Sequence, residues 1–169
     1  GGGTAVRLAV EVAGIRFKNP LLAASGTFGY GVEYEGILDL SLLGGIVSKG
    51  LYLEPRDGAP PPRIVETPSG LLNAIGLQGG GIHAFVRDVL PRMARHDTAL
   101  LVNVCGDTVD EYAEVARICD GVPGIAGLEV NISCPNVKKG GMAFGGDPRL
   151  THEVVAAVRK ATRLPVVPK

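Results

Sequence analysis

The sequence has no excess of charge of either sign and no long apolar run. Its 17 Lys and Arg residues balance 17 Asp and Glu residues, and like charges do not cluster into a long run. A polyanion such as nucleic acid is therefore not expected as a partner. No stretch approaches the ~18 consecutive apolar residues of a membrane span, and charged residues interrupt the apolar N-terminal segment. We therefore expect neither a membrane span nor a secretory signal, but a cytoplasmic protein.

Paired cysteines and the common nucleotide-binding motifs are also missing. The three cysteines, Cys105, Cys119 and Cys134, are odd in number and have no C-x-x-C spacing. This pattern argues against a disulfide framework and against a zinc site, and we predict no metal site. No G-x-G-x-x-G motif follows a predicted strand, and no Walker sequence occurs. We expect Cys105 and Cys119 to be small buried side chains.

Apolar residues instead alternate between strand-like runs and helical spacing, which is the pattern of β/α units around a parallel sheet. Helical apolar faces occur over 82–93, 112–119 and 154–161. Two short alternating runs around Gly14 predict a hairpin within 6–18. The predicted buried strands are 20–24, 45–48, 100–104, 127–132 and 165–169.

Five strands in this order fit either a doubly wound sheet or the first part of a (β/α)8 barrel. The periodicity of the apolar residues alone does not distinguish these two architectures. A barrel typically needs ~250 residues, so a barrel of this length would be incomplete. In both architectures ligands bind at the carboxyl ends of the strands. We expect polar side chains there, with no carboxylate or histidine among them: Ser25, Thr27, Ser48, Lys49, Asn103, Asn131, Ser133, Cys134, Asn136 and Lys169.

The segment 131–141, with the sequence NISCPNVKKGG, is the most informative. A thiol at the mouth of a strand, ahead of two lysines, can have a lowered pKa and act as a nucleophile or an acid/base group. A lone cysteine is more often a buried apolar side chain. The amides of Asn131 and Asn136 favour a functional Cys134, because they need hydrogen-bond partners and a polar ligand would supply them.

A cysteine hydrolase would also need a histidine to activate the thiol. His83, His96 and His152 fall in or beside the predicted helices, and none follows a strand. We expect these histidines to be solvated or to cap helices. The hydrolase hypothesis is therefore weak.

Lys49 directly follows a buried strand, where a positive charge is costly unless an anion meets it. An anionic ligand is the simplest partner, and an ion pair with Glu54 or Glu66 is the alternative. The glycine-broken segment 67–81 is too irregular for a helix or a strand, and its N–H groups could hold a carboxylate. Alternatively, its apolar side chains plug the mouth of a barrel: Leu71, Leu72, Ile75 and Leu77.

Taken together, five motifs over about residues 8–169 resemble the class 1 dihydroorotate dehydrogenases. The sequence Asn73-Ala74-Ile75-Gly76-Leu77-Gln78 is similar to that of the class 1B catalytic subunit. The cysteine at position 134 separates the chain from class 2, which has a serine there. The five motifs are ASGTFG at 24–29, SKG at 48–50, NAIGLQ at 73–78, NV at 103–104 and NISCPN at 131–136.

This resemblance implies an FMN-containing (β/α)8 barrel that oxidises dihydroorotate to orotate in pyrimidine synthesis. In that family a loop thiol removes a proton from C5 of the substrate while hydride passes from C6 to N5 of the flavin, and Cys134 matches this base. Substrate-binding positions match Lys49, Asn73, Ala74, Ile75, Gly76, Leu77, Asn131 and Asn136. Flavin-binding positions match Ser25, Lys49, Gly50, Asn103, Asn131 and Lys169.

The resemblance also implies that residues 1–169 are the N-terminal part of a single FMN-binding barrel domain. We expect the chain to form about the first five β/α units of the barrel and the protein to be a homo-oligomer. For class 1B we also expect a partner subunit with FAD and an iron–sulfur cluster that passes electrons to NAD⁺. These residues alone should bind FMN poorly and be inactive. Pro168 removes a backbone donor from a predicted central strand, which makes the place of Lys169 less certain. Two alternatives stay open: a related flavin barrel that reduces pyrimidines, of the dihydropyrimidine or dihydrouridine type, and an inactive fragment or assembly module without cofactor.

Overall fold

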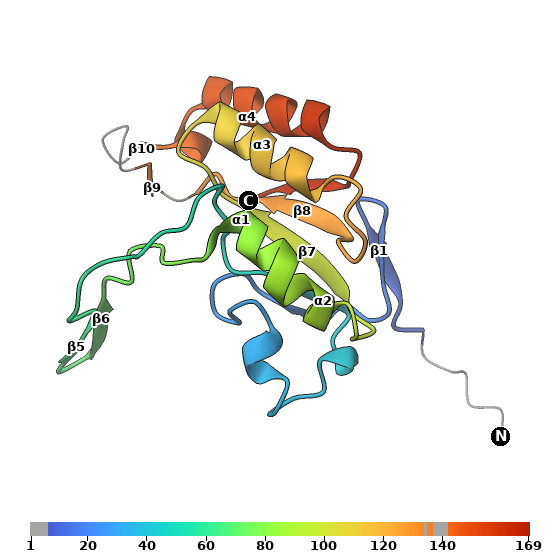
Figure 1. Cartoon of the computed structure of the whole chain (residues 1–169), viewed down its shortest axis with the longest axis horizontal. Helices are drawn as coiled ribbons and strands as arrows, with labels where there is room; N and C mark the ends of the chain where they lie inside the picture. Colours follow the sequence, from blue (N-terminus) through green and yellow to red (C-terminus); the bar gives the residue numbers. More distant parts are fainter. Residues whose placement is uncertain (1–6, 134, 137–141) are drawn as a thin grey trace.

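A parallel sheet forms the centre of the molecule in the computed structural model, which describes residues 7–133, 135–136 and 142–169 (Figure 1). The sheet has five strands, and each strand pairs in parallel with the one before it in the order β3-β4-β7-β8-β11. A doubly wound sheet would reverse its order at a switch point. The unbroken order is that of consecutive strands in a (β/α)8 barrel, and the barrel alternative is confirmed. The strands are β3 (Leu22–Ala23), β4 (Gly45–Val47), β7 (Ala99–Val104), β8 (Gly127–Val130) and β11 (Val166–Pro168).

Helical segments connect these strands where the apolar spacing predicts them. One continuous segment between β4 and β7 consists of α1 (Gly81–Ala84), the π-helical turn η3 (Phe85–Val89) and α2 (Leu90–Met93). The π-helical turn comes just before Pro91, whose missing N–H interrupts the α-helical hydrogen-bond pattern. The other connections are α3 (Val109–Cys119) and α4 (Pro148–Ala161), and they pack against each other.

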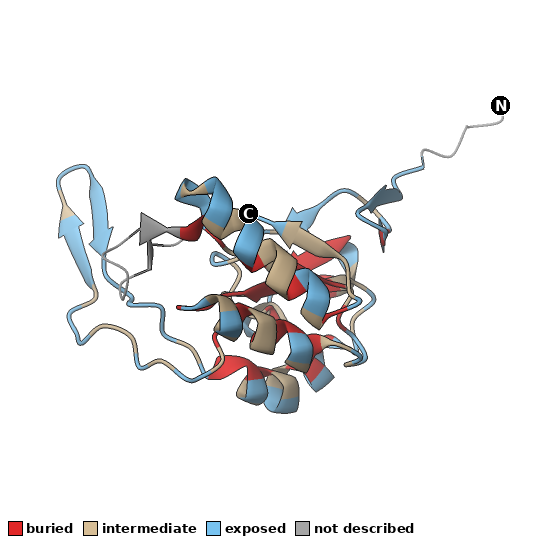
Figure 2. Ribbon diagram, turned by 90° about the horizontal axis from the view of Figure 1, so that it is seen from above, coloured by how far each residue is buried: buried red, intermediate tan, exposed pale blue. Residues whose placement is uncertain are grey.

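The main core lies between these helices and one face of the sheet. Because side chains alternate along a strand, Ile46, Leu100 and Val102 face the helices while Val47 and Leu101 face the opposite side. Figure 2 shows the buried residues along the strands and on the helix sides that face them. The main cluster also takes in residues from every helix: Ile82, Phe85, Met93, Val115, Ala116, Val154 and Val158.

The N-terminal hairpin covers the amino ends of the strands. β1 (Val10–Val12) and β2 (Ile15–Phe17) pair antiparallel around Gly14, whose φ of 80° suits glycine, so the predicted hairpin is confirmed. Ile15 and Phe17 form a small cluster with Val47 and Leu101 on the inner face of the sheet. The carboxyl ends of the strands lie at the opposite end of the parallel sheet.

A second hairpin corrects the prediction that segment 67–81 is irregular throughout. β5 (Ile64–Thr67) pairs antiparallel with β6 (Gly70–Asn73), and this hairpin extends away from the body of the molecule (Figure 1). Leu71 and Leu72 are 66% and 67% exposed, so they do not plug the barrel mouth. The remaining elements are β9 (Pro135–Asn136), β10 (Met142–Ala143), η1 (Val32–Tyr34), η2 (Leu40–Leu42) and η5 (Phe144–Gly146).

Two polar caps fix the starts of the long helices. The Thr108 hydroxyl accepts a hydrogen bond from the Glu111 N–H at 3.2 Å, so Thr108 caps α3. Asp147 accepts from the Arg149 N–H at 2.7 Å, and Pro148 takes the first position of α4. Within the described residues, no helix has the length and apolar character needed to cross a membrane.

Replacing Thr108 with alanine should lower the free energy of unfolding by about 1 kcal/mol, because one N–H at the start of α3 loses its acceptor. Thr108→Ser keeps the hydroxyl and should stay within a few tenths of a kcal/mol of the unchanged protein. Urea denaturation of both variants measures the difference. Equal loss in the serine and alanine variants would contradict the capping role.

Candidate active site

A cavity of about 660 Å³ lies at the carboxyl ends of the sheet strands. Each of the five strands contributes polar groups to its wall, because parallel strands end at the same edge of a sheet. Every residue that the resemblance assigns to the flavin borders it: Ser25, Lys49, Gly50, Asn103, Asn131 and Lys169. Ile75, Leu77, Cys105 and Ser133 also border it, as do Gly26, Gly29, Tyr30, Glu33 and Tyr52.

Lys169 takes a defined place in this wall despite Pro168. Its N–H donates to the Val130 carbonyl at 2.9 Å, and its own carbonyl accepts from the Ile132 N–H at 2.9 Å. The ammonium group donates to the Ser25 hydroxyl and lies 3.1 Å from Oε1 of Glu129. The last strand therefore continues the sheet through the proline.

The expectation that no carboxylate comes near this rim is wrong, because Glu33 borders the cavity. A second carboxylate near the rim is that of Glu129. Its side chain is only 14% exposed, and Oε1 accepts a hydrogen bond from Nδ2 of Asn103 at 2.5 Å as well as contacting Lys169. Glu129 lies on β8, two residues before Asn131, which directly follows the strand, so both side chains leave the same face of the sheet. The period-2 alternation of that strand is the signal that could have found it.

The two asparagines of the rim are held in fixed orientations. Oδ1 of Asn103 faces Nδ2 of Asn131 and the Cys105 thiol, both at 3.4 Å. The Asn103 N–H donates to the Ser48 hydroxyl at 3.1 Å, and the Asn131 carbonyl accepts from the Tyr112 hydroxyl at 2.5 Å. Ser48 and Tyr112 therefore fix the backbone of the two asparagines, and the contact between the two amides orients their side chains.

The two described cysteines, Cys105 and Cys119, are both buried, as predicted, but they lie in different parts of the fold. Cys105 borders the cavity, whereas Cys119 packs in the main core. Burial raises the pKa of the Cys119 thiol to about 12, so that thiol stays neutral at physiological pH. Cys119 is therefore a structural residue.

Lys49 presents its charge to two neighbouring cavities. Its backbone N–H donates to the Gly29 carbonyl at 2.7 Å, which fixes the start of the loop after β4. Neither Glu54 nor Glu66 pairs with its ammonium group, and no other carboxylate in the described ranges does so. The alternative of an ion pair with Glu54 or Glu66 is therefore wrong, and the charge is available to a ligand.

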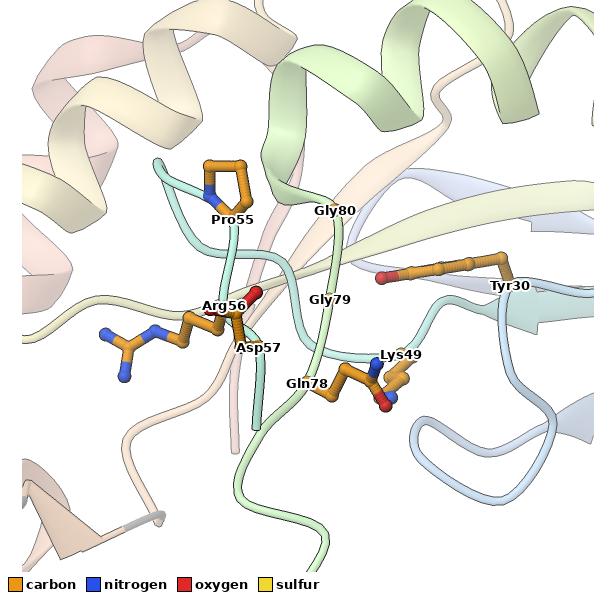
Figure 3. Close-up of a pocket in the computed structure, with 8 residues that line it drawn as sticks. All are labelled: Tyr30, Lys49, Pro55, Arg56, Asp57, Gln78, Gly79 and Gly80. Carbon is orange, nitrogen blue, oxygen red and sulfur yellow. The ribbon is translucent and has the colours of Figure 1, made fainter. Parts of the chain in front are cut away.

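The second cavity, of about 450 Å³, is lined by segments 55–57 and 78–80 and shares Tyr30 and Lys49 with the first. In Figure 3 the Tyr30 ring points toward this segment, and Arg56 points away from Lys49. Burial raises the pKa of the Tyr30 phenol, and the nearby Glu33 carboxylate acts in the same direction, so the phenol stays protonated. Tyr30 was not singled out in the sequence, although it directly follows the ASGTFG motif.

The predicted substrate segment is only partly brought to the cavity. Ile75 and Leu77 border it, whereas Asn73, Ala74 and Gly76 do not. Gly76 has a φ of 74°, and a Cβ there would lie 2.2 Å from the Ala59 nitrogen, so glycine is required for this loop path. Cys134 and the Asn136 side chain lie outside the described residues.

The donor set of the cavity suits an organic anion rather than a metal ion. Among the residues that the structure describes, no group of three His, Cys, Asp or Glu side chains could hold a metal. His83 and His152 are exposed, and His96 lies 3.2 Å from Glu35. None of the three histidines borders the cavity, which agrees with the sequence argument against a cysteine hydrolase.

Comparison with known proteins identifies the family. The dihydroorotate dehydrogenase family model matches residues 7–169. The chain is 59% identical over 164 residues to the "Dihydroorotate dehydrogenase B (NAD(+)), catalytic subunit" of Desulforudis audaxviator, covering 97% of this chain and 53% of the relative. The relatives of the same name from Geotalea uraniireducens and Geobacter sulfurreducens are 54% and 52% identical over 162 residues, with coverages of 96% and 53% for both.

The chain thus spans about half the length of the curated relatives it matches. The predicted resemblance to the class 1B catalytic subunit is confirmed by the names of these relatives. The chain belongs to the dihydroorotate dehydrogenase family, whose members are flavin-dependent barrel enzymes.

Proposed function

We propose that this chain supplies the N-terminal part of a single FMN-binding barrel domain in a class 1B dihydroorotate dehydrogenase, which oxidises dihydroorotate to orotate. The observation that carries the proposal is the meeting of two lysines and two asparagines at one cavity: Lys49, Lys169, Asn103 and Asn131. These residues come from four different strand ends, and the polar groups suit an anionic heterocycle.

The residues present fit FMN. Asparagine amides offer both donors and acceptors, as the polar edge of the flavin ring requires. Gly50 lets the wall come close to a ligand, since a Cβ there would lie 2.8 Å from the Cys105 sulfur and 3.1 Å from Oδ1 of Asn103. Ser25, Lys49, Gly50, Asn103, Asn131 and Lys169 would hold the cofactor.

The oxidation removes two hydrogens from adjacent substrate carbons. Bound FMN would supply the acceptor for the hydride that leaves C6. The Cys134 thiolate would take the proton from C5, so that the C5–C6 double bond of orotate forms from the C5–H electron pair. Lysine ammonium groups beside the flavin would stabilise the negative charge that the reduction brings into the site.

Dihydroorotate would be bound by residues on the other side of the flavin ring. The Lys49 ammonium would pair with the carboxylate of dihydroorotate, and the amides of Asn131 and Asn136 would bind its polar ring atoms. The segment from Asn73 to Leu77 would close over the substrate, with Ile75 and Leu77 excluding water from the reacting carbons.

The partner proposals follow from the names of the relatives. Those proteins are called catalytic subunits and carry NAD(+) in their names. A catalytic subunit implies a second, electron-transfer subunit, and we propose that it carries FAD and an iron–sulfur cluster that deliver electrons to NAD⁺. We also propose that the catalytic chain forms a homo-oligomer.

The absorption spectrum of the full-length protein, recorded before and after anaerobic addition of dihydroorotate, tests the function. We expect a flavin spectrum that dihydroorotate bleaches. Faster turnover with dihydrouracil or with dihydrouridine in tRNA would favour a pyrimidine-reducing enzyme instead. A colourless, non-fluorescent preparation would favour a module without cofactor.

Replacing Gly50 with alanine should weaken FMN binding by about tenfold or more, because the new methyl group displaces the Asn103 amide or narrows the cavity. Gly36→Ala is the matched control, since a Cβ at Gly36 would meet nothing within 4 Å. Flavin fluorescence titration of both apoproteins measures the dissociation constants. Equal FMN affinity in the two variants would place the cofactor away from Gly50.

A further inference from the structure

A nearly buried carboxylate supports the cavity wall without bordering the cavity. Glu129 on β8 is not among the residues that line it, and its side chain is 14% exposed. One of its oxygens nevertheless contacts two lining residues, Nδ2 of Asn103 at 2.5 Å and Nζ of Lys169 at 3.1 Å. The resemblance stated above gives Glu129 no role.

The strand register explains this central place. Glu129 lies directly opposite Asn103 on β7 and Val167 on β11. Lys169 follows Val167 by two residues, so its side chain leaves the same face of the sheet. A single carboxylate can therefore reach both neighbouring strands at once.

The carboxylate decides which way the Asn103 amide points. A carboxylate only accepts hydrogen bonds, so the NH₂ group of Asn103 must face Glu129. The amide oxygen is then turned toward Nδ2 of Asn131 and the Cys105 thiol. Without the negative charge, the amide would gain the freedom to turn over.

The same carboxylate fixes and offsets the charge of Lys169. The ammonium group is held between Glu129 and the Ser25 hydroxyl. An almost buried carboxylate is costly, and an ion pair of this kind is weak evidence for a gain in stability. Its contact with two cavity-lining groups points to a role at the site.

We propose that Glu129 is a positioning residue for the flavin site: it holds the Asn103 amide and the Lys169 ammonium in the orientation that meets the flavin, and it offsets the positive charge of Lys169. This inference rests on the function proposed above. A flavin gains negative charge on two-electron reduction, so a nearby carboxylate opposes the reduction and its removal should favour it.

The midpoint potential of bound FMN in the full-length protein is the test. Glu129→Gln should raise it by about 30 mV, which corresponds to a tenfold change for a two-electron couple, and should weaken FMN binding by roughly tenfold. Glu129→Asp keeps the charge and should restore the potential. Glu153→Gln removes a carboxylate from the exposed side of α4 and should leave both quantities unchanged.

The outcomes separate this inference from the proposed function. If the unaltered protein neither binds FMN nor reacts with dihydroorotate, the proposed function fails. If it does both and Glu129→Gln keeps the original potential, the positioning role is overturned, even where thermal stability has fallen. Failure of both the glutamine and the aspartate variants to fold would also overturn it, because the carboxylate would then serve the fold.

Discussion

Replacing Cys134 with serine in the full-length protein is expected to slow flavin reduction by dihydroorotate by about 10²- to 10⁴-fold, the usual contribution of a positioned base. A serine hydroxyl is far less acidic than a thiol and is almost never ionised near pH 7. FMN should remain bound, since none of the proposed flavin contacts is altered. Stopped-flow absorption under anaerobic conditions measures the rate.

Cys119→Ala is the matched control for this experiment. The Cys119 thiol is buried in the main core, and its pKa of about 12 keeps it neutral, so it cannot serve as a base. The control should retain the original rate and lose only some stability through the small cavity that it leaves. An unchanged rate in Cys134→Ser would remove the thiol from the reaction.

The pH dependence provides a second readout of the same base. If the Cys134 thiolate takes the proton, the reduction rate should rise with pH until the thiol is fully ionised, and then level off. The serine variant should show no such rise over the same range. A rise of equal size in both proteins would assign the titration to another group.

The residues proposed to bind the flavin could be predicted because they lie at the carboxyl ends of the parallel strands. Parallel strands end at one edge, so polar residues after successive strands meet there whatever their spacing in the sequence. Ser25 and Lys169 illustrate this, since they are far apart in the chain and form a hydrogen bond. The order of the strands needed the structure, because periodicity is the same in a barrel and in a doubly wound sheet.

Glu129 and the β5-β6 hairpin were missed for two different physical reasons. Glu129 lies within β8, whereas the predicted site residues lie at or after the ends of the strands. A rule based on strand ends does not include a side chain that reaches the site from within the sheet. The hairpin carries apolar side chains that are exposed, such as Leu71 and Leu72, and apolar patterns predict burial. An apolar sequence pattern indicates which side chains are hydrophobic, but it does not indicate whether other residues cover them.

Pro168 proved compatible with the sheet for a reason that only pairing reveals. In a parallel strand successive N–H groups point to alternate sides. The Lys169 N–H donates to Val130 on β8, so the nitrogen of Pro168, one residue earlier, faces away from β8. The proline therefore removes no hydrogen bond from this pair of strands.

Replacing Lys49 with methionine should weaken the binding of dihydroorotate by about 10- to 100-fold, because a charge-assisted hydrogen bond contributes about 1.5–3 kcal/mol. Methionine keeps an unbranched apolar stem of four heavy atoms and removes the ammonium group with its charge. Lys160→Met, on the exposed last turn of α4, is the control for loss of one positive charge. Titration of the FMN-loaded protein with orotate, which carries the same carboxylate as dihydroorotate and does not reduce the flavin, measures the affinity.

The thermal stability of the same variant distinguishes a functional charge from a structural one. Lys49 is half-buried and pairs with no carboxylate in the described part of the chain, so its charge has a desolvation cost that no ion pair offsets. Methionine should therefore maintain or raise the thermal midpoint while ligand binding falls. Charges kept at a cost to stability are a property of binding sites. A lower thermal midpoint with unchanged orotate affinity would instead assign Lys49 to the support of the loop after β4.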